Sequence, residues 1–441
     1  MLYRILKSLL KGTVRIFFRS IYLNHKNLIP NDGPLIIVAN HPSMFMDPIL
    51  IAASIDRKVS FLAKGSIFNN KLAAKILPKL GLIPIHRQQD DPSQLGKNAN
   101  TFKRCFEHLE KGGALLIFPE GISNSSQRKL QPIKSGAARI ALGAENRNNN
   151  TLGVNISIIG LNYENQHKFN QDVLINIEEP LKVSEYINKF DNPADEITET
   201  IRKKLEANTI SIENKTHDEL ARKIEMLMQQ EQDVRSFTAN YDLTHNIANA
   251  INYFDKINPE RINQISNKIE KYFLKLNEIG VEDAAINSKN AQLNATHILS
   301  LFRLLIGLPF YLFGLINNFL PYEIPAIVAN KLKDKDLKGS VGMVLGIFTF
   351  LLFYAVQICL LQLWFKSLII TLIYSFSIAP LGFFAYYYWY ACIEVKMRFT
   401  LIIHSYRNSE VVSNILKARL EIMDELNDCK NIFLEKSFLN K

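Results

Sequence analysis

The sequence is poor in cysteine and in charged side chains, and both scarcities narrow what the chain can be. Its four cysteines are scattered among 441 residues without metal-like spacing, so we expect free thiols and neither a metal site nor a disulfide framework. Charged residues make up only 21% and hydrophobic residues 47%, which allows a large core and a membrane-embedded part. No Gly-x-Ser-x-Gly motif occurs, which excludes the serine nucleophile elbow.

The first twenty residues contain no acidic side chain. Their cations recur at spacings of three and four, which places them on one helical face: Arg4, Lys7, Lys11, Arg15 and Arg19. Near an anionic lipid surface each exposed cation contributes about 1 kcal/mol. We therefore predict a basic amphipathic membrane-associating helix over residues 1–25, with an ordinary core-packing helix as the alternative. No apolar stretch here is long enough for a signal peptide.

Between residues 30 and 182, short apolar runs alternate with helical patterns. The runs of strand length cover 35–39, 59–63, 82–85, 114–118, 155–163 and 173–177. The stretches between them carry lysine and arginine at helical spacing. Strands that alternate with helices predict an α/β domain, here a mixed sheet flanked by helices, with its chemistry on loops at the strand ends.

The rest of the chain is first polar and helical, then apolar. Residues 183–297 have the pattern of amphipathic helices without a catalytic signature. A membrane region follows over 298–395, and we expect 396–441 to form a C-terminal helical tail. Within the membrane region, the long uncharged segments 341–364 and 368–391 predict a transmembrane hairpin, because a span needs about 20 apolar residues.

The apolar segment 298–320 differs from the hairpin because it contains Arg303 and Pro309. Basic residues precede and follow the hairpin, which by the positive-inside tendency places both of its ends on the cytoplasmic side. With the basic N-terminal domain on that side too, the segment cannot cross the membrane once. We expect it to be re-entrant or to lie in one leaflet, and three true spans are the alternative.

The predicted strand 35–39 leads directly into a histidine and then a helix start. His41 lies on the strand-end loop, while Asp47 and Pro48 have the pattern of an N-cap and a first helical residue. The simplest interpretation is that Asp47 only caps the helix. A carboxylate near an imidazole can also fix its tautomer and stabilise the imidazolium, however. Such a pair is suited to general-base removal of a hydroxyl proton.

Two further strand ends carry polar groups. Arg87 closes the pattern "GLIPIHR", and its fork of donors suits a phosphate as well as it suits a surface salt bridge. Glu120 and Gly121 follow the next predicted strand, 114–118, where a plain turn is the alternative. Lys134 precedes a helical pattern and marks either an ordinary helix start or donors for an anion.

These residues resemble the glycerolipid acyltransferases that act on glycerol-3-phosphate and lysophosphatidate. The resemblance covers residues 30–180 and depends on an ordered set of motifs, "NHPSMFMD", "GLIPIHR", "FPEGIS" and "IIGLNY". It implies that His41 and Asp47 are the catalytic pair and that Arg87 binds the acceptor phosphate. It also implies that the third motif binds substrate through Glu120, Gly121 and Ser123.

The chain departs from the common family pattern at two places. Five residues, rather than four, separate His41 from Asp47, which a loop absorbs if the helix begins at Asp47. The third motif continues "ISN" where the family has Thr-Arg-Ser, so a phosphate-binding arginine is missing. The cations that we expect to replace it are Arg128, Lys129 or Lys134. Both departures resemble the branch that acylates glycerol-3-phosphate or dihydroxyacetone phosphate.

The reaction that we expect is acyl transfer from acyl-CoA or acyl carrier protein to glycerol-3-phosphate, without a cofactor and without a covalent acyl-enzyme. Lysophosphatidate acylation is the first alternative, followed by a transacylase or hydrolase. An inactive membrane-anchored scaffold is the alternative of another class. We expect an integral protein of a bacterial inner membrane or endoplasmic reticulum, with the catalytic domain on the cytoplasmic face. No nucleic-acid partner is expected, because the basic residues lie largely beside membrane segments.

Overall fold

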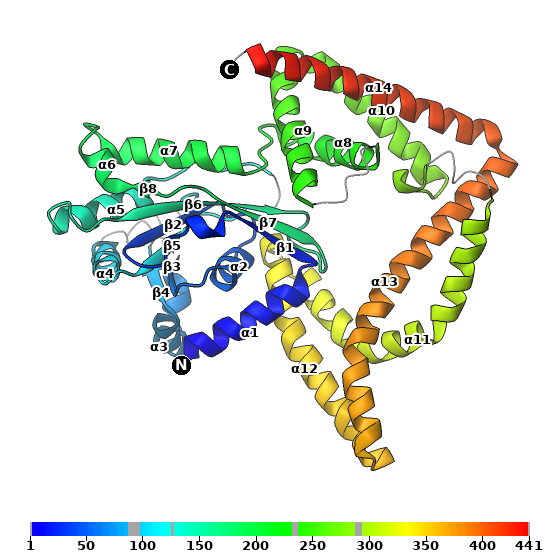
Figure 1. Ribbon diagram of the computed structural model, residues 1–441, viewed down its shortest axis with the longest axis horizontal. Coiled ribbons are helices and arrows are strands. Elements are labelled where there is room, and N and C mark those ends of the chain that lie inside the picture. The colour runs from blue at the N-terminus through cyan, green and yellow to red at the C-terminus, as the bar shows by residue number, and fades with distance from the viewer. Residues whose placement is uncertain (1, 87–97, 125–127, 232–236, 287–292, 440–441) are drawn as a thin grey trace. The chain divides into compact units, whose positions relative to one another are not determined.

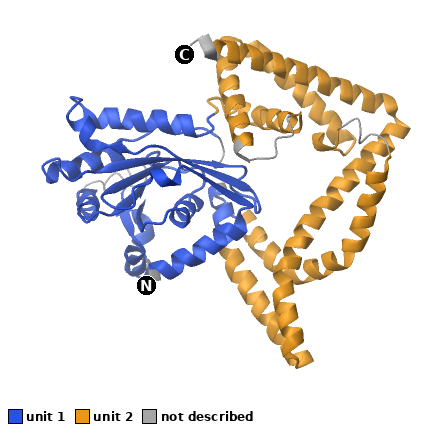
Figure 2. Ribbon diagram, viewed as in Figure 1, with its two compact units in different colours: residues 1–211, 332–343 blue, residues 212–331, 344–441 orange. Residues whose placement is uncertain are grey.

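The computed structural model describes residues 2–86, 98–124, 128–231, 237–286 and 293–439 (Figure 1). It divides into two compact units, residues 1–211 with 332–343 and residues 212–331 with 344–441 (Figure 2). The first unit extends past the domain end predicted at residue 182. It also includes a short segment from within the predicted membrane region.

One eight-stranded sheet forms the centre of the first unit (Figure 1). Its strands are β1 (Ser20–Asn24), β2 (Leu35–Ala39), β3 (Val59–Lys64), β4 (Leu82–Ile85), β5 (Ala114–Ile117), β6 (Asn155–Tyr163), β7 (Asp172–Ile177) and β8 (Leu181–Lys182). Their order is β1-β7-β6-β2-β5-β3-β4, with β8 also paired to β6. All pairings are parallel except β6 with β7 and β6 with β8, which are antiparallel. The predicted mixed sheet is confirmed.

Helices and 3-10 turns connect these strands or precede and follow them in the chain. They are α1 (Leu2–Phe17), η1 (Lys26–Leu28), α2 (Met46–Ser54), η2 (Gly65–Phe68), α3 (Lys71–Ile76), η3 (Leu77–Leu80), α4 (Asn98–Glu110), α5 (Gly136–Arg147), α6 (Val183–Ile187) and α7 (Pro193–Asn208). The N-terminal helix is therefore shorter than predicted, because the chain enters β1 instead of remaining helical to residue 25. Arg19 lies just before β1, and two of its guanidinium nitrogens donate to the two carboxylate oxygens of Asp172 at the start of β7, each at 2.9 Å. These hydrogen bonds hold the chain beside β7 where the helix ends.

Helices α4, α5 and α7 share one hydrophobic cluster with the central strands. Ile36 and Val38 of β2 face this cluster together, because alternate side chains of a strand point to the same side. Gly160 of β6 permits close approach of α7, since a Cβ there would lie 2.3 Å from the carbonyl oxygen of Asn208. This packing explains why the first unit continues beyond the boundary predicted at residue 182.

The second unit is built from helices in the residues that the structure describes. They are α8 (His217–Glu231), α9 (Phe237–Ile257), α10 (Pro259–Glu278), η5 (Asp283–Ala285), α11 (Ala295–Asn330), α13 (Leu368–Arg407), α14 (Ser409–Leu439) and most of α12 (Lys338–Phe365), which is preceded by η7 (Lys335–Leu337). The buried Arg419 of α14 pairs with Asp283 at 3.0 Å and contacts Glu231 at 3.3 Å. These contacts join the C-terminal tail to the helical region.

Among the residues that the structure describes, three helices are long and apolar enough to cross a membrane, namely α11, α12 and α13. Helices α12 and α13 cover the two segments of the predicted hairpin and are separated by Lys366 and Ser367. Helix α11 contains three prolines and bends along its length (Figure 1). Such a bend is expected at proline, which removes a backbone hydrogen bond and clashes with the preceding turn.

Candidate active site

The ends of three neighbouring strands bring the polar motifs to one edge of the sheet. Strands β2 and β5 run in parallel, so the loops that follow Ala39 and Ile117 leave the same edge. Strand β6 is also parallel to β2 and pairs Ile159 with Ala39, so it continues past the end of β2 to Tyr163. Strand β4 is parallel as well, but Arg87, which follows it, lies outside the described residues.

His41 and Asp47 form a hydrogen-bonded pair at this edge. The Nδ1 atom of His41 lies 2.7 Å from Oδ2 of Asp47. The Asp47 side chain is 0% exposed and that of His41 is 13% exposed. An ionised aspartate only accepts hydrogen bonds, so Nδ1 carries the hydrogen and Nε2 is the nitrogen left for a substrate proton.

The predicted N-cap role of Asp47 is wrong. Helix α2 begins one residue earlier, at Met46, and its N-cap residue is Phe45. The carbonyl of Ser43 accepts the N–H groups of Met46 (2.7 Å) and Asp47 (3.2 Å), which starts the helix before the aspartate. Oδ2 of Asp47 instead accepts the N–H of Ser43 at 2.8 Å, so the carboxylate orders the loop that carries His41.

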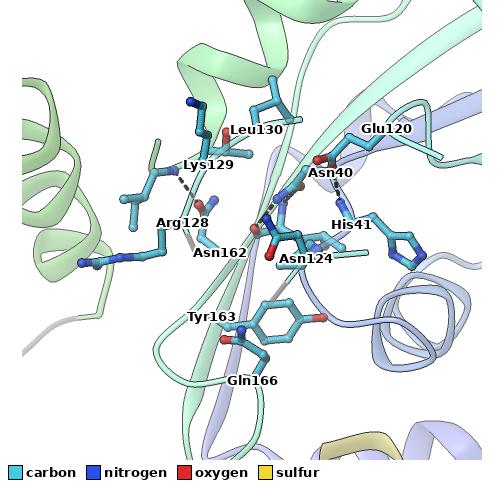
Figure 3. Close-up of a pocket in the computed structure, with 14 residues that line it drawn as sticks. Asn40, His41, Glu120, Asn124, Arg128, Lys129, Leu130, Asn162, Tyr163 and Gln166 are labelled. Atoms are coloured by element: carbon cyan, nitrogen blue, oxygen red, sulfur yellow. Dashed lines mark hydrogen bonds between the residues drawn. The ribbon is translucent and has the colours of Figure 1, made fainter. Parts of the chain in front are cut away.

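The loop after β5 holds the backbone of His41 from both sides (Figure 3). Oε1 of Glu120 accepts the N–H of His41 at 2.6 Å, and the N–H of Asn124 donates to the His41 carbonyl at 3.1 Å. Oε2 of Glu120 accepts the N–H of Gln131 at 2.8 Å. Burial raises the pKa of Glu120, although both N–H donors oppose the rise. The imidazole ring stacks on Phe118, with centroids 3.9 Å apart.

Two residues to which sequence reasoning gave no role, Asn40 and Tyr163, make hydrogen bonds at the site. Asn40 bonds both backbone groups of Leu161, through Nδ2 to the carbonyl (2.9 Å) and through Oδ1 to the N–H (2.7 Å). The hydroxyl of Tyr163 donates to Oδ1 of Asp47 at 2.7 Å. The sequence feature that could have pointed to these contacts is the length of the 155–163 run, which is longer than the neighbouring predicted strands.

The remaining predicted residues of the third motif lie around the Glu120 loop. Gly121 has a φ of +72°, and a Cβ there would lie 2.6 Å from Nζ of Lys134. The lysine amine therefore lies over the turn that the motif forms. The hydroxyl of Ser123 donates to Oδ2 of Asp336 at 2.8 Å. The Ser123 side chain therefore points toward the segment 332–343.

A pocket opens beside the pair (Figure 3). Among the residues that line it are Asn40, His41, Glu120, Arg128, Lys129 and Tyr163. The charged ends of Arg128 and Lys129 point away from His41 in Figure 3. Within the described ranges, no cluster of three His, Cys, Asp or Glu side chains is arranged to hold a metal ion.

Comparison with known proteins gives one family. Residues 20–163 match the model described as Acyltransferase. The 1-acyl-sn-glycerol-3-phosphate acyltransferase BAT2 of Brassica napus is 33% identical over 125 residues, 28% of this chain and 34% of that protein. Glycerol-3-phosphate O-acyltransferase 1 of Saccharomyces cerevisiae is 25% identical over 304 residues, 48% of this chain and 39% of that protein.

A solved structure is also similar in part. The 1-acyl-sn-glycerophosphate acyltransferase PlsC of Thermotoga maritima is 18% identical, with a TM-score of 0.34, over 46% of this chain and 78% of that one. The chain spans between about a third and two fifths of the length of the two curated relatives named above. Residues 20–163 therefore form a domain of the acyltransferase family, whose members similar to this chain include glycerolipid acyltransferases of both acceptor types.

Proposed function

We propose that this protein transfers a fatty acyl group to a hydroxyl of glycerol-3-phosphate. The observation that carries the proposal is the 2.7 Å contact between His41 and the buried Asp47 in a domain of the acyltransferase family. With Nδ1 bonded to the carboxylate, Nε2 is oriented as a base. The charge of Asp47 stabilises the imidazolium that forms when His41 accepts a proton.

The chemistry needs one base and no enzyme-bound acyl group. His41 Nε2 takes the proton of the acceptor hydroxyl while its oxygen attacks the thioester carbonyl of acyl-CoA or acyl carrier protein. The tetrahedral intermediate collapses with cleavage of the C–S bond, and the imidazolium returns its proton to the leaving sulfur. The products are the acyl ester and the free thiol, and His41 is neutral again.

Binding of the acceptor phosphate is assigned to cations near the Glu120 loop. The Lys134 amine lies over Gly121, and the adjacent Glu120 contacts the backbone of His41, so a phosphate at Lys134 brings its hydroxyl close to the base. Arg87 remains a predicted ligand because its strand ends at the same sheet edge. Glu120 already accepts two backbone N–H groups, so we assign it to loop geometry before acceptor binding.

The choice of acceptor is supported by how far the relatives match. The alignment with the yeast glycerol-3-phosphate O-acyltransferase 1 covers 48% of this chain, whereas that with the plant 1-acyl-sn-glycerol-3-phosphate acyltransferase covers 28%. Lysophosphatidate is the second candidate, because the similar bacterial proteins bear names of that acyltransferase type. An inactive scaffold has no need of the buried His-Asp contact.

The test is acyl transfer by the purified, detergent-solubilised chain. Labelled palmitoyl-CoA and acyl carrier protein are offered glycerol-3-phosphate, dihydroxyacetone phosphate and lysophosphatidate in parallel. His41→Ala should lower the rate by a factor of about 100 to 10,000, the usual range for a general base. His245→Ala on α9 is the matched control and should retain the rate. Preference for lysophosphatidate would overturn the acceptor, and no transfer by folded protein would overturn the enzyme.

The N-terminal helix α1 has features of both a core-packing helix and a membrane-associating helix. Val14 and Phe17 are buried against the domain, whereas Ile5 and Ile16 are exposed by 58% and 61% on the same helix as the exposed cations. This mixed surface supports attachment of α1 to an anionic bilayer, with one face kept on the acyltransferase unit. The lysines that flank the hairpin support a cytoplasmic face for the domain.

Contacts within the first unit constrain the membrane topology. Ser123 bonds Asp336, and a Cβ on Gly339 would lie 2.2 Å from the carbonyl oxygen of Gln166. Ser340 and Met343 are buried in the same segment. Residues 332–337 and the first turns of α12 thus fold against the acyltransferase domain, which supports a placement of both on one side of the membrane.

This constraint supports the re-entrant interpretation of α11. Among the described residues before 332, α11 is the one helix long and apolar enough to span, so a single crossing would separate the domain from the segment that contacts it. In the second unit, α14 packs against α10, with Arg261 and Asp428 paired, so the chain returns to the starting side after α13. Two crossings by the hairpin and none by α11 satisfy both conditions.

Polar side chains at the bend of α11 fit a helix that enters and leaves one side. Asn318 accepts from the Tyr354 hydroxyl of α12 (2.6 Å) and donates to the Ile378 carbonyl of α13 (3.1 Å). Asn317 accepts from the Tyr374 hydroxyl at 2.6 Å. Lipid chains offer no hydrogen-bond partners, so polar groups at membrane depth must bond within the protein, as the amides of Asn317 and Asn318 do here.

Labelling of single cysteines tests the topology. In a cysteine-free background, Leu293→Cys and Lys333→Cys place one thiol on each side of α11, at residues exposed in the structure. A membrane-impermeant maleimide added to sealed vesicles should label both positions from the same side. Labelling from opposite sides would show a true span and overturn the re-entrant helix.

A further inference from the structure

The buried Asp47 carboxylate has a different set of donors on each of its oxygens. Oδ2 receives the imidazole of His41 (2.7 Å) and the N–H of Ser43 (2.8 Å). Oδ1 receives the hydroxyl of Tyr163 at 2.7 Å. We propose that Tyr163 is a positioning residue of the catalytic pair, whose phenol holds Asp47 in the orientation that directs His41. This inference depends on the proposed function.

The strand geometry makes Tyr163 a fixed donor. Tyr163 ends β6, where it pairs with Val173 of the antiparallel β7, and its ring packs against Phe18 with centroids 5.9 Å apart. The phenol therefore comes from the sheet, the carboxylate from α2 and the imidazole from the β2 loop. A donor on a rigid strand limits rotation of a carboxylate better than a loop donor does.

The surroundings of Tyr163 keep its hydroxyl protonated, so that it remains a hydrogen-bond donor. Burial and the nearby Asp47 charge raise the pKa of Tyr163 well above its ordinary value, so the hydroxyl stays protonated at neutral pH. Glu120 faces the pair from the β5 loop, through the N–H of His41. Helix α1 packs on α2, but its Lys7 bonds the carbonyl of Ile55 at the far end of that helix.

Loss of the phenol has two consequences for the pair. Oδ1 becomes a buried carboxylate oxygen without this donor, which raises the proton affinity of the pair because a hydrogen bond to the charged form is lost. The carboxylate also gains freedom to rotate, which weakens the alignment of His41 with the acceptor hydroxyl. The first effect moves the acidic limb of the pH–rate profile upward, and the second lowers kcat.

Tyr163→Phe is the test, with Tyr186→Phe as the matched control. Tyr186 also donates its hydroxyl within the first unit, to Thr200 at 3.3 Å, but away from the pair. We expect Tyr163→Phe to lower kcat about 10- to 100-fold with KM changed less than threefold, and to shift the acidic limb upward by about one pH unit. The control should change neither. A wild-type kcat, or a lower rate with an unmoved acidic limb, would overturn the inference.

A second variant keeps the test decisive if Tyr163→Phe does not fold. Replacement of Tyr163 by 3-fluorotyrosine keeps the shape and strengthens the donor, so the acidic limb should move to lower pH. An unmoved limb in that variant would contradict the role. The outcome is separable from the proposed function, because His41→Ala alone tests the base. Loss of activity in His41→Ala with no effect at Tyr163 would overturn only this inference.

Discussion

A variant of Glu120 can distinguish two roles for this residue. If Glu120 supports the loop that carries His41, its loss lowers kcat, and if it binds the acceptor, its loss raises KM. Its carboxylate accepts the N–H of His41 at 2.6 Å and that of Gln131 at 2.8 Å. In Glu120→Gln, the one amide oxygen can satisfy one of these donors, while the NH2 group faces the other N–H. One charge-assisted hydrogen bond is lost outright, and the loop that carries the base loses its support.

The magnitude follows from the strength of that bond. A hydrogen bond to a charged group contributes about 1.5 to 3 kcal/mol, and about 1.4 kcal/mol corresponds to a factor of ten in rate. If the loss acts on the position of His41, kcat falls about 10- to 150-fold. The KM for glycerol-3-phosphate should change less than threefold, because the side chain is occupied by the backbone and not by the acceptor.

Steady-state acylation of glycerol-3-phosphate measures both constants, and the chain offers a close control. Glu145 is also buried and accepts two backbone N–H groups, from Val154 (2.6 Å) and Leu152 (3.1 Å), but lies on α5 away from the site. Glu145→Gln should lower thermal stability and leave kcat unchanged. A Glu120→Gln variant with normal kcat and a strongly raised KM would refute the brace and favour acceptor binding.

Three further predictions concern a turn, a buried ion pair and a thiol. Gly121→Ala should lower acylation about tenfold or more, because its φ of +72° costs about 1–2 kcal/mol with a Cβ that also displaces the amine of Lys134. Arg419→Met should lower the free energy of unfolding by about 3–5 kcal/mol, measured by denaturant titration, because Asp283 stays buried without its main partner. Cys105 should resist maleimide at pH 8, since burial raises its pKa to about 12 and leaves roughly one thiolate in 10,000.

Each of these predictions has an internal comparison. Gly33 has the same φ of +72°, and a Cβ there would have no atom within 4 Å, so Gly33→Ala should cost stability without lowering acylation. Arg202→Met removes two solvent-accessible ion pairs, with Glu199 and Glu206, and should cost less than about 1 kcal/mol. Cys105 should react readily in urea, and equal labelling before and after denaturation would contradict its burial.

Most strands of the sheet could be predicted from the local sequence pattern, whereas the ends of helices α1 and α2 could not. The apolar runs that predict β2, β3, β4, β5, β6 and β7 match the observed strands within a residue or so, because buried strands with polar turns leave a clear pattern. The strand Ser20–Asn24 was missed because its apolar residues Ile21, Tyr22 and Leu23 continue the apolar pattern of α1. The start of α2 was misplaced because the carbonyl of Ser43, and not the Asp47 side chain, begins the helix.

The sequence by itself determined the His41–Asp47 pairing as a hypothesis, because the two residues are six apart and a strand-end loop brings them together. The partners of that pair were decided by the tertiary structure. Tyr163 lies 116 residues from Asp47, and Glu120 lies 79 residues from His41. Their contacts depend on parallel strand order and on β6 extending past β2, and sheet register of this kind arises from the packing of the whole core and not from any local pattern of residues.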